Sequence, residues 1–373
     1  MTGSIVTAGP LSVSATTLQL PFRDPFRIAR ESDSAAATTV VIEVTDDRHA
    51  AGPGGPGVTG LGEGFPDTYY GETEATVHAV LPLLIASVIQ HWEVVRDAAT
   101  RGDVPATRSA LDAASDAMDF DLRHNGAAKC AVDIGLRDLA ARLLGVPLHV
   151  LEGLSRDIPP TDFTVGIDEP EIVAARAERA AAFPFLKVKV GGPADLDTLE
   201  RVRAVFPGVL RVDANTAWDP EAGARMVPDL VRLGVELIEQ PFPAHRLDQL
   251  AWLQARSELP IVADESAVTI LDLDPLVGVV AGVNVKLAKC GGTGPARRML
   301  TRARELGFRT FLGCMEETRV GIAGSAAVAS LADWVDLDGC LLLADDPFEG
   351  LDLDADHRWI LPETPGMGVR RKV

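Results

Sequence analysis

The stretch LKVKVGGPADLDTLERVRAVFPGVLRVD, residues 186–213, decides the fold. Two short apolar runs, Leu186–Val190 and Leu210–Asp213, predict strands. Between them Leu199, Val202 and Phe206 recur at i, i+3 and i+7, the spacing of one face of a helix. A strand, a helix and a second strand in this order are typical of a βαβ unit with parallel strands.

The same alternation continues on both sides of this stretch, from about residue 160 to residue 338. It predicts eight strands, at Phe163–Ile167, Leu186–Val190, Leu210–Asp213, Glu236–Glu239, Ile261–Asp264, Val283–Leu287, Thr310–Gly313 and Val335–Asp338. Matching strand-end residues stand at positions 187, 213, 239, 264, 286, 313 and 336, at intervals of 22 to 27 residues. Eight such units fit a TIM-like (β/α) barrel of the α/β class. An open, doubly wound sheet is the alternative.

The residues before the barrel have a different pattern. Apolar and polar residues alternate between residues 10 and 48, which predicts antiparallel strands, and a glycine- and proline-rich hairpin loop follows at residues 50–57. From Glu72 to about Gly145 the apolar spacing becomes helical. We therefore expect an α+β domain at residues 1–130, the barrel at 131–344 and a C-terminal segment at 345–373.

Composition excludes several classes of protein. The chain has 373 residues, 47% of them apolar, and 54 acidic against 35 basic residues give a net charge of −19. Such a charge repels phosphate backbones and anionic membrane surfaces, so we expect neither nucleic acid nor membrane as a partner. The longest apolar stretch, residues 79–89, is shorter than the roughly 18 residues of a membrane-spanning helix.

Two further sequence features indicate the cytoplasm. The N-terminus has no basic segment followed by an apolar one, so we expect no secretory signal. The four cysteines, Cys130, Cys290, Cys314 and Cys340, are widely spaced and form no C-x-x-C pair, which is typical of a reducing compartment.

Charged residues interrupt the predicted barrel strands near their C-terminal ends. Strands buried on both faces are normally continuous runs of apolar residues, and barrel enzymes carry their active sites at these ends. The charged residues are Lys187, Lys189, Asp213, Glu239, Asp264, Lys286, Asp336 and Asp338. A single strand-end carboxylate is often only a helix cap, but so many charges on one barrel mouth predict a catalytic site.

The ring of strands predicts how these charges are arranged. Asp213, Glu239 and Asp264 end three consecutive strands and supply hard oxygen ligands, which suit one Mg²⁺, with Mn²⁺ as a candidate substitute. The strands of Lys189 and Lys286 are second and sixth of eight, so these lysines approach a bound molecule from opposite sides. Asp336 and Asp338 lie across the mouth from Glu239, where they can hold a cation at the far end of a substrate.

This constellation favours the removal of a proton α to a carboxylate. The resulting enediolate carries two negative charges, which a metal ion and ammonium groups stabilise. A lysine acts as base only if its pKa falls, and a neighbouring cation such as Lys187 lowers it. With one base on each face, the proton can return from the side opposite to its removal, which inverts the α-carbon.

At this point the chain resembles the enolase superfamily, in its muconate lactonizing enzyme subgroup, over nearly its whole length. The matching segments are AVDIGLRDLA (131–140) with GVPL (145–148), LKVK (186–189), VDAN (212–215), LIEQP (237–241), VADES (262–266) and NVKLAKCGG (284–292). The resemblance implies a (β/α)7β barrel closed by two loops of an N-terminal capping domain, which the C-terminal segment completes. It further implies Mg²⁺ on Asp213, Glu239 and Asp264, acid/base roles for Lys189 and Lys286, and supporting roles for Asn215 and Glu265.

Within this subgroup the DLD segment at 336–338 and GCMEET at 313–318 most resemble the dipeptide epimerases. In those enzymes such an aspartate pair binds the ammonium group of the dipeptide. The resemblance thus implies an isomerase that inverts the C-terminal residue of an L,L-dipeptide.

Residues on the expected capping loops bear on specificity. Relatives that take acidic dipeptides carry an arginine on the first loop, where this chain has Glu31, with Arg30 one position earlier. Glu316 follows the seventh strand, where such relatives have an apolar residue. Acidic groups at both places favour a substrate with a basic side chain. Tyr70 is expected to reach the site from the second loop.

Other activities remain open at this stage. o-Succinylbenzoate synthase and N-acylamino acid racemase share the metal and lysine residues but do not need Asp336 and Asp338. Muconate cycloisomerase needs only one base, and its dicarboxylate substrate would be repelled by that pair. A non-catalytic binding protein is a further alternative, which the complete set of carboxylates and lysines disfavours. Apart from its substrate, the expected partner is a second copy of the chain, in a homo-oligomer.

Overall fold

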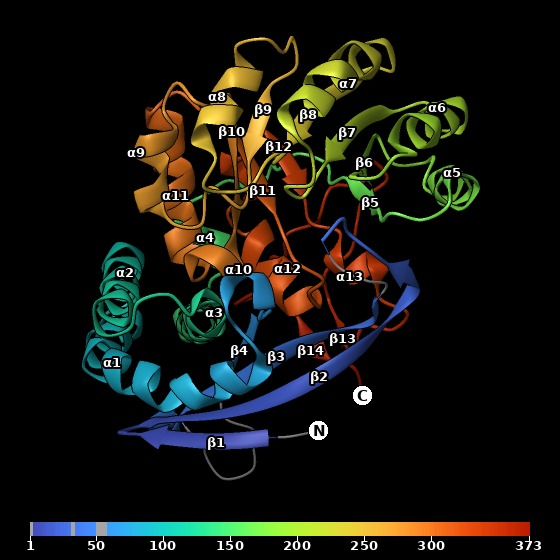
Figure 1. The fold of residues 1–373 in the computed structure, drawn as a ribbon. Helices are drawn as coiled ribbons and strands as arrows, with labels where there is room; N and C mark the ends of the chain where they lie inside the picture. The colour runs from blue at the N-terminus through green and yellow to red at the C-terminus, as the bar shows by residue number, and fades with distance from the viewer. Residues whose placement is uncertain (1–2, 31–33, 50–57) are drawn as a thin grey trace.

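The computed structural model describes residues 3–30, 34–49 and 58–373, and its N-terminal part forms a four-stranded antiparallel sheet (Figure 1). The strands, in sheet order, are β1 (Gly3–Ala8), β2 (Leu11–Phe26), β3 (Ser34–Asp46) and β4 (Thr59–Gly64). β2 and β3 confirm the antiparallel strands predicted between residues 10 and 48. The predicted hairpin loop at residues 50–57 lies outside the described residues.

Three helices follow where the helical pattern predicted them; the first and third pack on this sheet, and the second packs on the other two. They are α1 (Glu74–Thr100), α2 (Val104–Asp121) and α3 (Gly126–Leu144). α3 lies directly on β4 because β4 has glycine at every second position, Gly60, Gly62 and Gly64. A Cβ on Gly62 would lie 2.0 Å from the carbonyl oxygen of Ala131. Side chains in this row would therefore push the helix off the sheet.

Among the described helices, only α1 is long and apolar enough to span a membrane by length and composition. It extends on both sides of the apolar stretch at residues 79–89. Leu81, Leu84 and Val88 on one face of α1 are fully buried, and the helix packs against α2, α3 and β1. This is the packing of a core helix.

Eight parallel strands form the second sheet, and they follow one another in chain order (Figure 1). They are β5 (Phe163–Val165), β6 (Phe185–Lys189), β7 (Val209–Asp213), β8 (Val235–Glu239), β9 (Ile261–Ala263), β10 (Gly282–Lys286), β11 (Arg309–Gly313) and β12 (Trp334–Asp336). The first and last strands meet where the amide of Asp162 donates to the carbonyl of Val335 at 3.0 Å. The predicted barrel is therefore confirmed, and the doubly wound alternative is wrong, because its strand order would not follow the chain.

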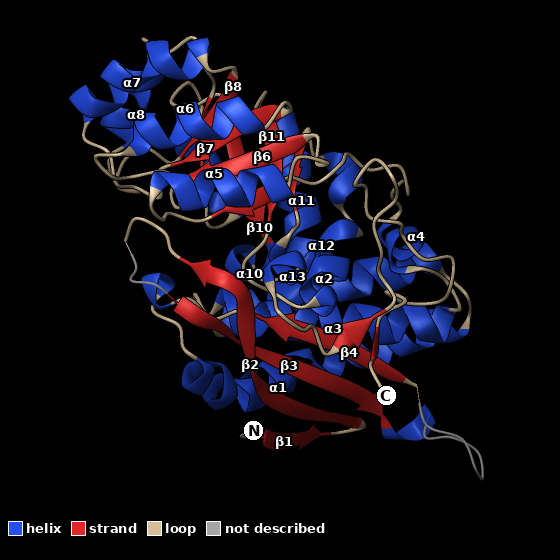
Figure 2. Ribbon diagram, turned by 90° about the vertical axis from the view of Figure 1, so that its right-hand side faces the viewer, coloured by secondary structure: helices blue, strands red, loops and turns tan. Residues whose placement is uncertain are grey.

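One or two helices follow each barrel strand, and most of them cover the outer face of the sheet (Figures 1 and 2). They are α5 (Pro170–Arg179), α6 (Asp195–Val205), α7 (Pro220–Arg232), α8 (Leu247–Gln254), α9 (Leu273–Leu276), α10 (Leu287–Cys290), α11 (Thr293–Glu305), α12 (Arg319–Ala326) and α13 (Gly339–Leu342). The short α4 (Leu148–Glu152) precedes them. Because α10 begins directly after β10, Lys286 is the last residue before a sharp change of direction.

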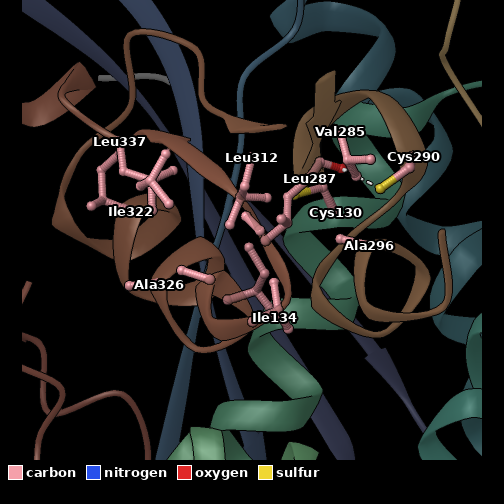
Figure 3. Packing of buried hydrophobic residues seen from close by; sticks show 14 of the residues in the cluster. Cys130, Ile134, Val285, Leu287, Cys290, Ala296, Leu312, Ile322, Ala326 and Leu337 are labelled. Atoms are coloured by element: carbon pink, nitrogen blue, oxygen red, sulfur yellow. Dashed lines mark hydrogen bonds between the residues drawn. The ribbon is translucent and has the colours of Figure 1, made fainter. Parts of the chain in front are cut away.

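One hydrophobic core continues from the N-terminal helices into the barrel. Figure 3 shows Cys130 and Ile134 of α3 beside Leu287 and Cys290 of α10. All four side chains belong to a single buried cluster, and both cysteines are free thiols. α3 therefore serves as a shared wall between the N-terminal sheet and the barrel.

A buried cluster of ion pairs joins the same two parts. Arg137 of α3, which is fully buried, donates to Asp133 at 3.0 Å, to Glu152 of α4 at 2.7 Å and to Asp112 of α2 at 2.8 Å. Arg297 of α11 donates to Glu152 at 2.9 Å and also pairs with Asp112. We call these five residues the Arg137 cluster.

The C-terminal segment returns to the N-terminal sheet. It contains two short antiparallel strands, β13 (Phe348–Glu349) and β14 (Arg370–Arg371). Arg371 lies 3.5 Å from Glu43 of β3, and Gly366 pairs with Pro147. The division of the chain at residues 130/131 and 344/345 stays a prediction.

Candidate active site

Three buried carboxylates meet at the C-terminal ends of adjacent barrel strands. Asp213 ends β7, Glu239 ends β8, and Asp264 directly follows β9. One ligand oxygen from each lies within 4.8 Å of the others, and all three residues are at most 2% exposed. The sheet register pairs Asp213 with Glu239, so neighbouring strand ends bring the two side chains together.

The electrostatics of this triad suit a divalent cation. Burial and the neighbouring Asp213 raise the pKa of Glu239 to about 7. Burial would also raise the pKa of Asp264, but the ammonium groups of Lys286 and Lys289 hold it below its ordinary value. Carboxylates that repel one another in a buried site need a cation, and an all-oxygen set is the one that Mg²⁺ prefers. The donor set therefore fits the predicted metal.

Two lysines flank the triad from opposite sides of the barrel. Lys189 at the end of β6 lies 2.6 Å from Asp213, and Lys286 at the end of β10 lies 3.0 Å from Asp264. β6 and β10 are four strands apart in the sheet of eight. The structure thus brings together the two lysines that the sequence singled out as candidate bases.

The pKa of Lys286 differs from the expectation that neighbouring cations lower it. Burial lowers this pKa, but the carboxylates of Asp264 and Glu239 outweigh burial and raise it above its ordinary value. Lys187 lowers the pKa of Lys286, as expected, but its effect is smaller than that of the two carboxylates. Neutralising the charge of these carboxylates would therefore make Lys286 a better base.

Lys187 spans the barrel between the triad and the aspartate pair. Its Nζ contacts Asp336 and lies 3.5 Å from Glu239. The amide of Thr164 donates to Asp338 at 2.5 Å, and the hydroxyl of Thr164 donates to Asp336 at 3.2 Å. Burial and the adjacent Asp336 raise the pKa of Asp338 to about 8. Within the described part of the chain, Asp338 accepts from Thr164 but forms no ion pair.

A cavity of about 350 Å³ opens above these groups, and we call it the first cavity. Its lining includes Lys187, Lys189, Lys286, Asn215, Asp336, Asp338, Glu316 and Arg30. Part of its cover is the segment after β2, where the carbonyl of Arg27 accepts from the amide of Ile167 at 2.9 Å. Glu316 is half-buried and, among the described residues, has no hydrogen bond or ion pair.

The other predicted specificity residues are placed differently. Arg30 contacts Glu265, lies 3.8 Å from Asp67 and stacks 4.4 Å above the ring of Tyr69. Its charge is thus already paired, and it ties the covering segment to the barrel. Tyr70 lines a neighbouring cavity beside α2 and α3 instead of the described part of the first cavity, and its contact with substrate stays a prediction. Glu31 lies outside the described residues.

Comparison with known proteins identifies the family. Residues 12–153 match the family model of the mandelate racemase / muconate lactonizing enzyme N-terminal domain. Residues 172–372 match the model of the enolase C-terminal domain-like family. The chain belongs to the enolase superfamily. The resemblance to the muconate lactonizing enzyme subgroup is thereby confirmed.

Several relatives of this enolase-superfamily chain are named epimerases. An L-Ala-D/L-Glu epimerase of Bacteroides thetaiotaomicron is 37% identical over 97% of this chain and 88% of the relative. An L-Lys-D/L-Arg epimerase of Methylococcus capsulatus is 35% identical over 96% of this chain and 98% of the relative. A dipeptide epimerase of Enterococcus faecalis, solved with Mg and the dipeptide L-Leu-L-Tyr, superposes with a TM-score of 0.82 at 28% identity, covering 98% of this chain and 99% of that one. The predicted enzyme class, an isomerase acting on amino acid derivatives, and the predicted Mg²⁺ agree with these relatives.

Several residues hold the triad in place. Asn215 donates to the carboxylate of Asp213 twice, from its backbone amide at 2.9 Å and from its side-chain Nδ2 at 3.3 Å. Asn215 also lies 3.4 Å from Glu265, the partner of Arg30. The two residues expected to support the ligands therefore connect the triad to the covering segment.

Two further supports are ones that the sequence reasoning missed. Lys289 has no exposed surface on its side chain and donates to Asp264, to the carbonyl of Ala267 and to the carbonyl of Asn284. Asn284 donates to Glu239 at 2.6 Å. A lysine inside the apolar LAKC segment directly after a strand was the available signal, since a buried lysine needs several acceptors.

Metal binding gives a prediction that does not depend on activity. Adding Mg²⁺ should raise the midpoint of thermal unfolding, because the triad is assembled only in the folded chain; saturation at a hundred times Kd stabilises it by about 2.7 kcal/mol. Asp264→Asn should lose this rise, whereas Asp116→Asn, at an exposed aspartate of α2, should keep it. An equal Mg²⁺ response in both variants would contradict the assignment of the triad.

Proposed function

We propose that the chain is a Mg²⁺-dependent dipeptide epimerase that inverts the α-carbon of the C-terminal residue of an L,L-dipeptide. The observation that carries this proposal is that two lysines face each other across the barrel, while Asp336 and Asp338 lie at the far side of the same cavity and Asp338 has no ion pair among the described residues. The epimerase names of the relatives support it.

The three lysines of the first cavity each have a role in this proposal. Lys189 and Lys286 reach the α-carbon from opposite faces, so one Nζ removes the proton and the other returns one. Lys187 lies beside the substrate carboxylate and stabilises the negative charge that develops there. A bound Mg²⁺ supplies further positive charge at that carboxylate and makes the adjacent C–H bond more acidic.

Asp336 and Asp338 fix the other end of the substrate. A free N-terminal ammonium between them would supply the positive charge that Asp338 lacks. An N-acylated amino acid or a succinylbenzoate precursor has no such ammonium, so these alternative substrates would leave the pair unmatched. The expected homo-oligomer and cytoplasmic location stay predictions.

The experiment that tests the proposal measures α-proton exchange. Purified protein is incubated with Mg²⁺ and a library of dipeptides in D₂O, and the mass of each dipeptide is followed. We expect a gain of one deuteron per molecule in a subset of the library. If no dipeptide exchanges while Mg²⁺ still stabilises the protein, the proposed activity is wrong and N-acylamino acids become the next substrates to assay.

We also propose that the C-terminal side chain of the substrate is basic. Glu316 lines the first cavity without a partner among the described residues, and a half-buried carboxylate in that position prefers a cation. The relative that acts on L-Lys-D/L-Arg and the one that acts on L-Ala-D/L-Glu are similar to this chain at 35% and 37% identity, so identity alone favours neither side chain.

A comparison of substrates tests this preference. The kcat/KM for Ala-Lys and Ala-Arg should exceed that for Ala-Glu by at least about tenfold, because a glutamate side chain beside Glu316 places two like charges together. Glu316→Gln should reduce this ratio, and Glu305→Gln, on the outside of the barrel, should leave it unchanged. A preference of the wild-type enzyme for Ala-Glu would refute the idea.

A further inference from the structure

A second cavity of about 310 Å³ adjoins the first one. It lies where the end of β2 approaches β5, α5 and α13, the elements at the seam of the barrel (Figure 1). Phe26, Thr164 and Leu342 line both cavities. These three residues therefore form the boundary between the proposed catalytic groups and this additional space.

The second cavity has an apolar wall. This wall is formed by Phe163, Val165, Ala180, Phe183 and Leu341. A water molecule takes up about 30 Å³ in the liquid, so the space can hold an aromatic ring, whereas a methyl group would leave most of it empty.

The arginines at the rim of the second cavity already have partners. Arg176 lies 2.9 Å from Asp168, Arg179 lies 2.6 Å from Asp24, and Nε of Arg23 donates to the carbonyl of Leu343 at 2.8 Å. Asp168 and Asp24 already neutralise Arg176 and Arg179, so an anion would gain little by binding beside these two arginines. The cavity therefore favours an uncharged group.

Thr164 connects the second cavity to the aspartate pair. Its amide and hydroxyl hold Asp338 and Asp336, and the same residue lines the second cavity. An ammonium bound between the two aspartates would put the α-carbon of the N-terminal residue beside Thr164. The side chain on that carbon then starts at the boundary of the two cavities.

We propose that the second cavity receives the side chain of the N-terminal residue of the substrate, and that this side chain is large and apolar. The inference rests on the proposed function and adds the other half of the substrate to it. Alanyl dipeptides, the simplest substrates of this type, would fill only the first cavity.

The test varies the N-terminal residue and fills the second cavity. With one C-terminal residue kept constant, kcat/KM is measured for dipeptides that begin with Ala, Leu or Phe. We expect the wild-type enzyme to prefer Leu and Phe. Ala180→Phe, in the cavity wall, should lower kcat/KM for these two by at least about tenfold and change that for Ala by less than about twofold. Ala182→Phe, two residues further on and exposed, is the matched control and should change neither.

The outcomes separate the inference from the proposed function. If Ala180→Phe does not fold, Leu341→Phe fills the same cavity from α13. Two results would overturn the subsite while the proposed function stands. The first is a wild-type preference for Ala. The second is an equal loss of kcat/KM on all three dipeptides in the filled variants, with no such loss in Ala182→Phe. If none of the dipeptides exchanges its α-proton, the proposed function fails and the subsite fails with it.

Discussion

Replacing either Lys189 or Lys286 by alanine is expected to abolish epimerisation, with a loss of about 10³-fold or more in rate. Both lysines lie within 3.0 Å of a carboxylate of the triad and on opposite sides of the cavity. Inversion needs one base to remove the proton and one acid to return it on the other face. Neither lysine can take over the position of the other.

Exchange without inversion makes this prediction sharper. Each single variant keeps the lysine that faces one epimer, so it should still exchange the α-proton of that epimer in D₂O. Lys189→Ala and Lys286→Ala should retain exchange on opposite epimers, which proton NMR of the separate L,L- and L,D-dipeptides measures. Exchange of the same epimer by both variants would contradict a two-base reaction.

The matched control for the lysine variants is Lys129→Ala. Lys129 is also a buried lysine, but it lies on α3 and pairs with Asp119 at 2.6 Å, outside the described lining of the first cavity. Its removal should leave both exchange and epimerisation near the wild-type rate. If Lys129→Ala also lost activity, loss of a buried ammonium in general would explain the result.

Replacing Arg137 by leucine should lower the free energy of unfolding by about 3–5 kcal/mol, because it leaves the buried carboxylate of Asp133 without a counter-charge. Arg137 is fully buried and donates to Asp133, Glu152 and Asp112. Arg297, which reaches Glu152 and Asp112, cannot compensate Asp133 as well. Urea unfolding followed by circular dichroism measures the change.

Arg298→Leu is the comparison for this variant. Arg298 pairs with Asp112 at 3.3 Å and Asp116 at 3.0 Å, but its side chain is 28% exposed. A solvent-screened pair of this kind contributes about 1 kcal/mol or less. If the two variants were equally destabilised, burial would not explain how much Arg137 contributes to the free energy of unfolding.

The barrel and its catalytic face could be predicted because each depends on a local pattern. Lys187 and Lys189 interrupt an apolar strand at a spacing of two, and Asp213, Glu239 and Asp264 end successive strands at a nearly constant interval. In a barrel of parallel strands that follow the chain order, all C-terminal strand ends lie at the same face, so the strand positions alone predict that these residues come together.

Features that depend on contacts between distant segments could not be predicted in this way. β4 has the sequence TGLGEG, which resembles a loop, because its glycines serve the close approach of α3 rather than a turn. The sequence around Arg30 does not indicate its ion pairs, because its partners Asp67 and Glu265 come from two other segments of the chain. The position of Tyr70 likewise depends on how the covering segments fold over the barrel.

The Arg137 cluster limits how this enzyme can be recombined with its relatives. The segment that matches the N-terminal domain of the family contains Asp112, Asp133, Arg137 and Glu152. Arg297 lies in the segment that matches the C-terminal domain. A chimera that joins the N-terminal half of this chain to the barrel of another enzyme must therefore supply an arginine at the position of Arg297. Without it, the buried Glu152 and the partly buried Asp112 lose a cation, and the hybrid begins with a stability defect that no redesign of its substrate pocket would correct.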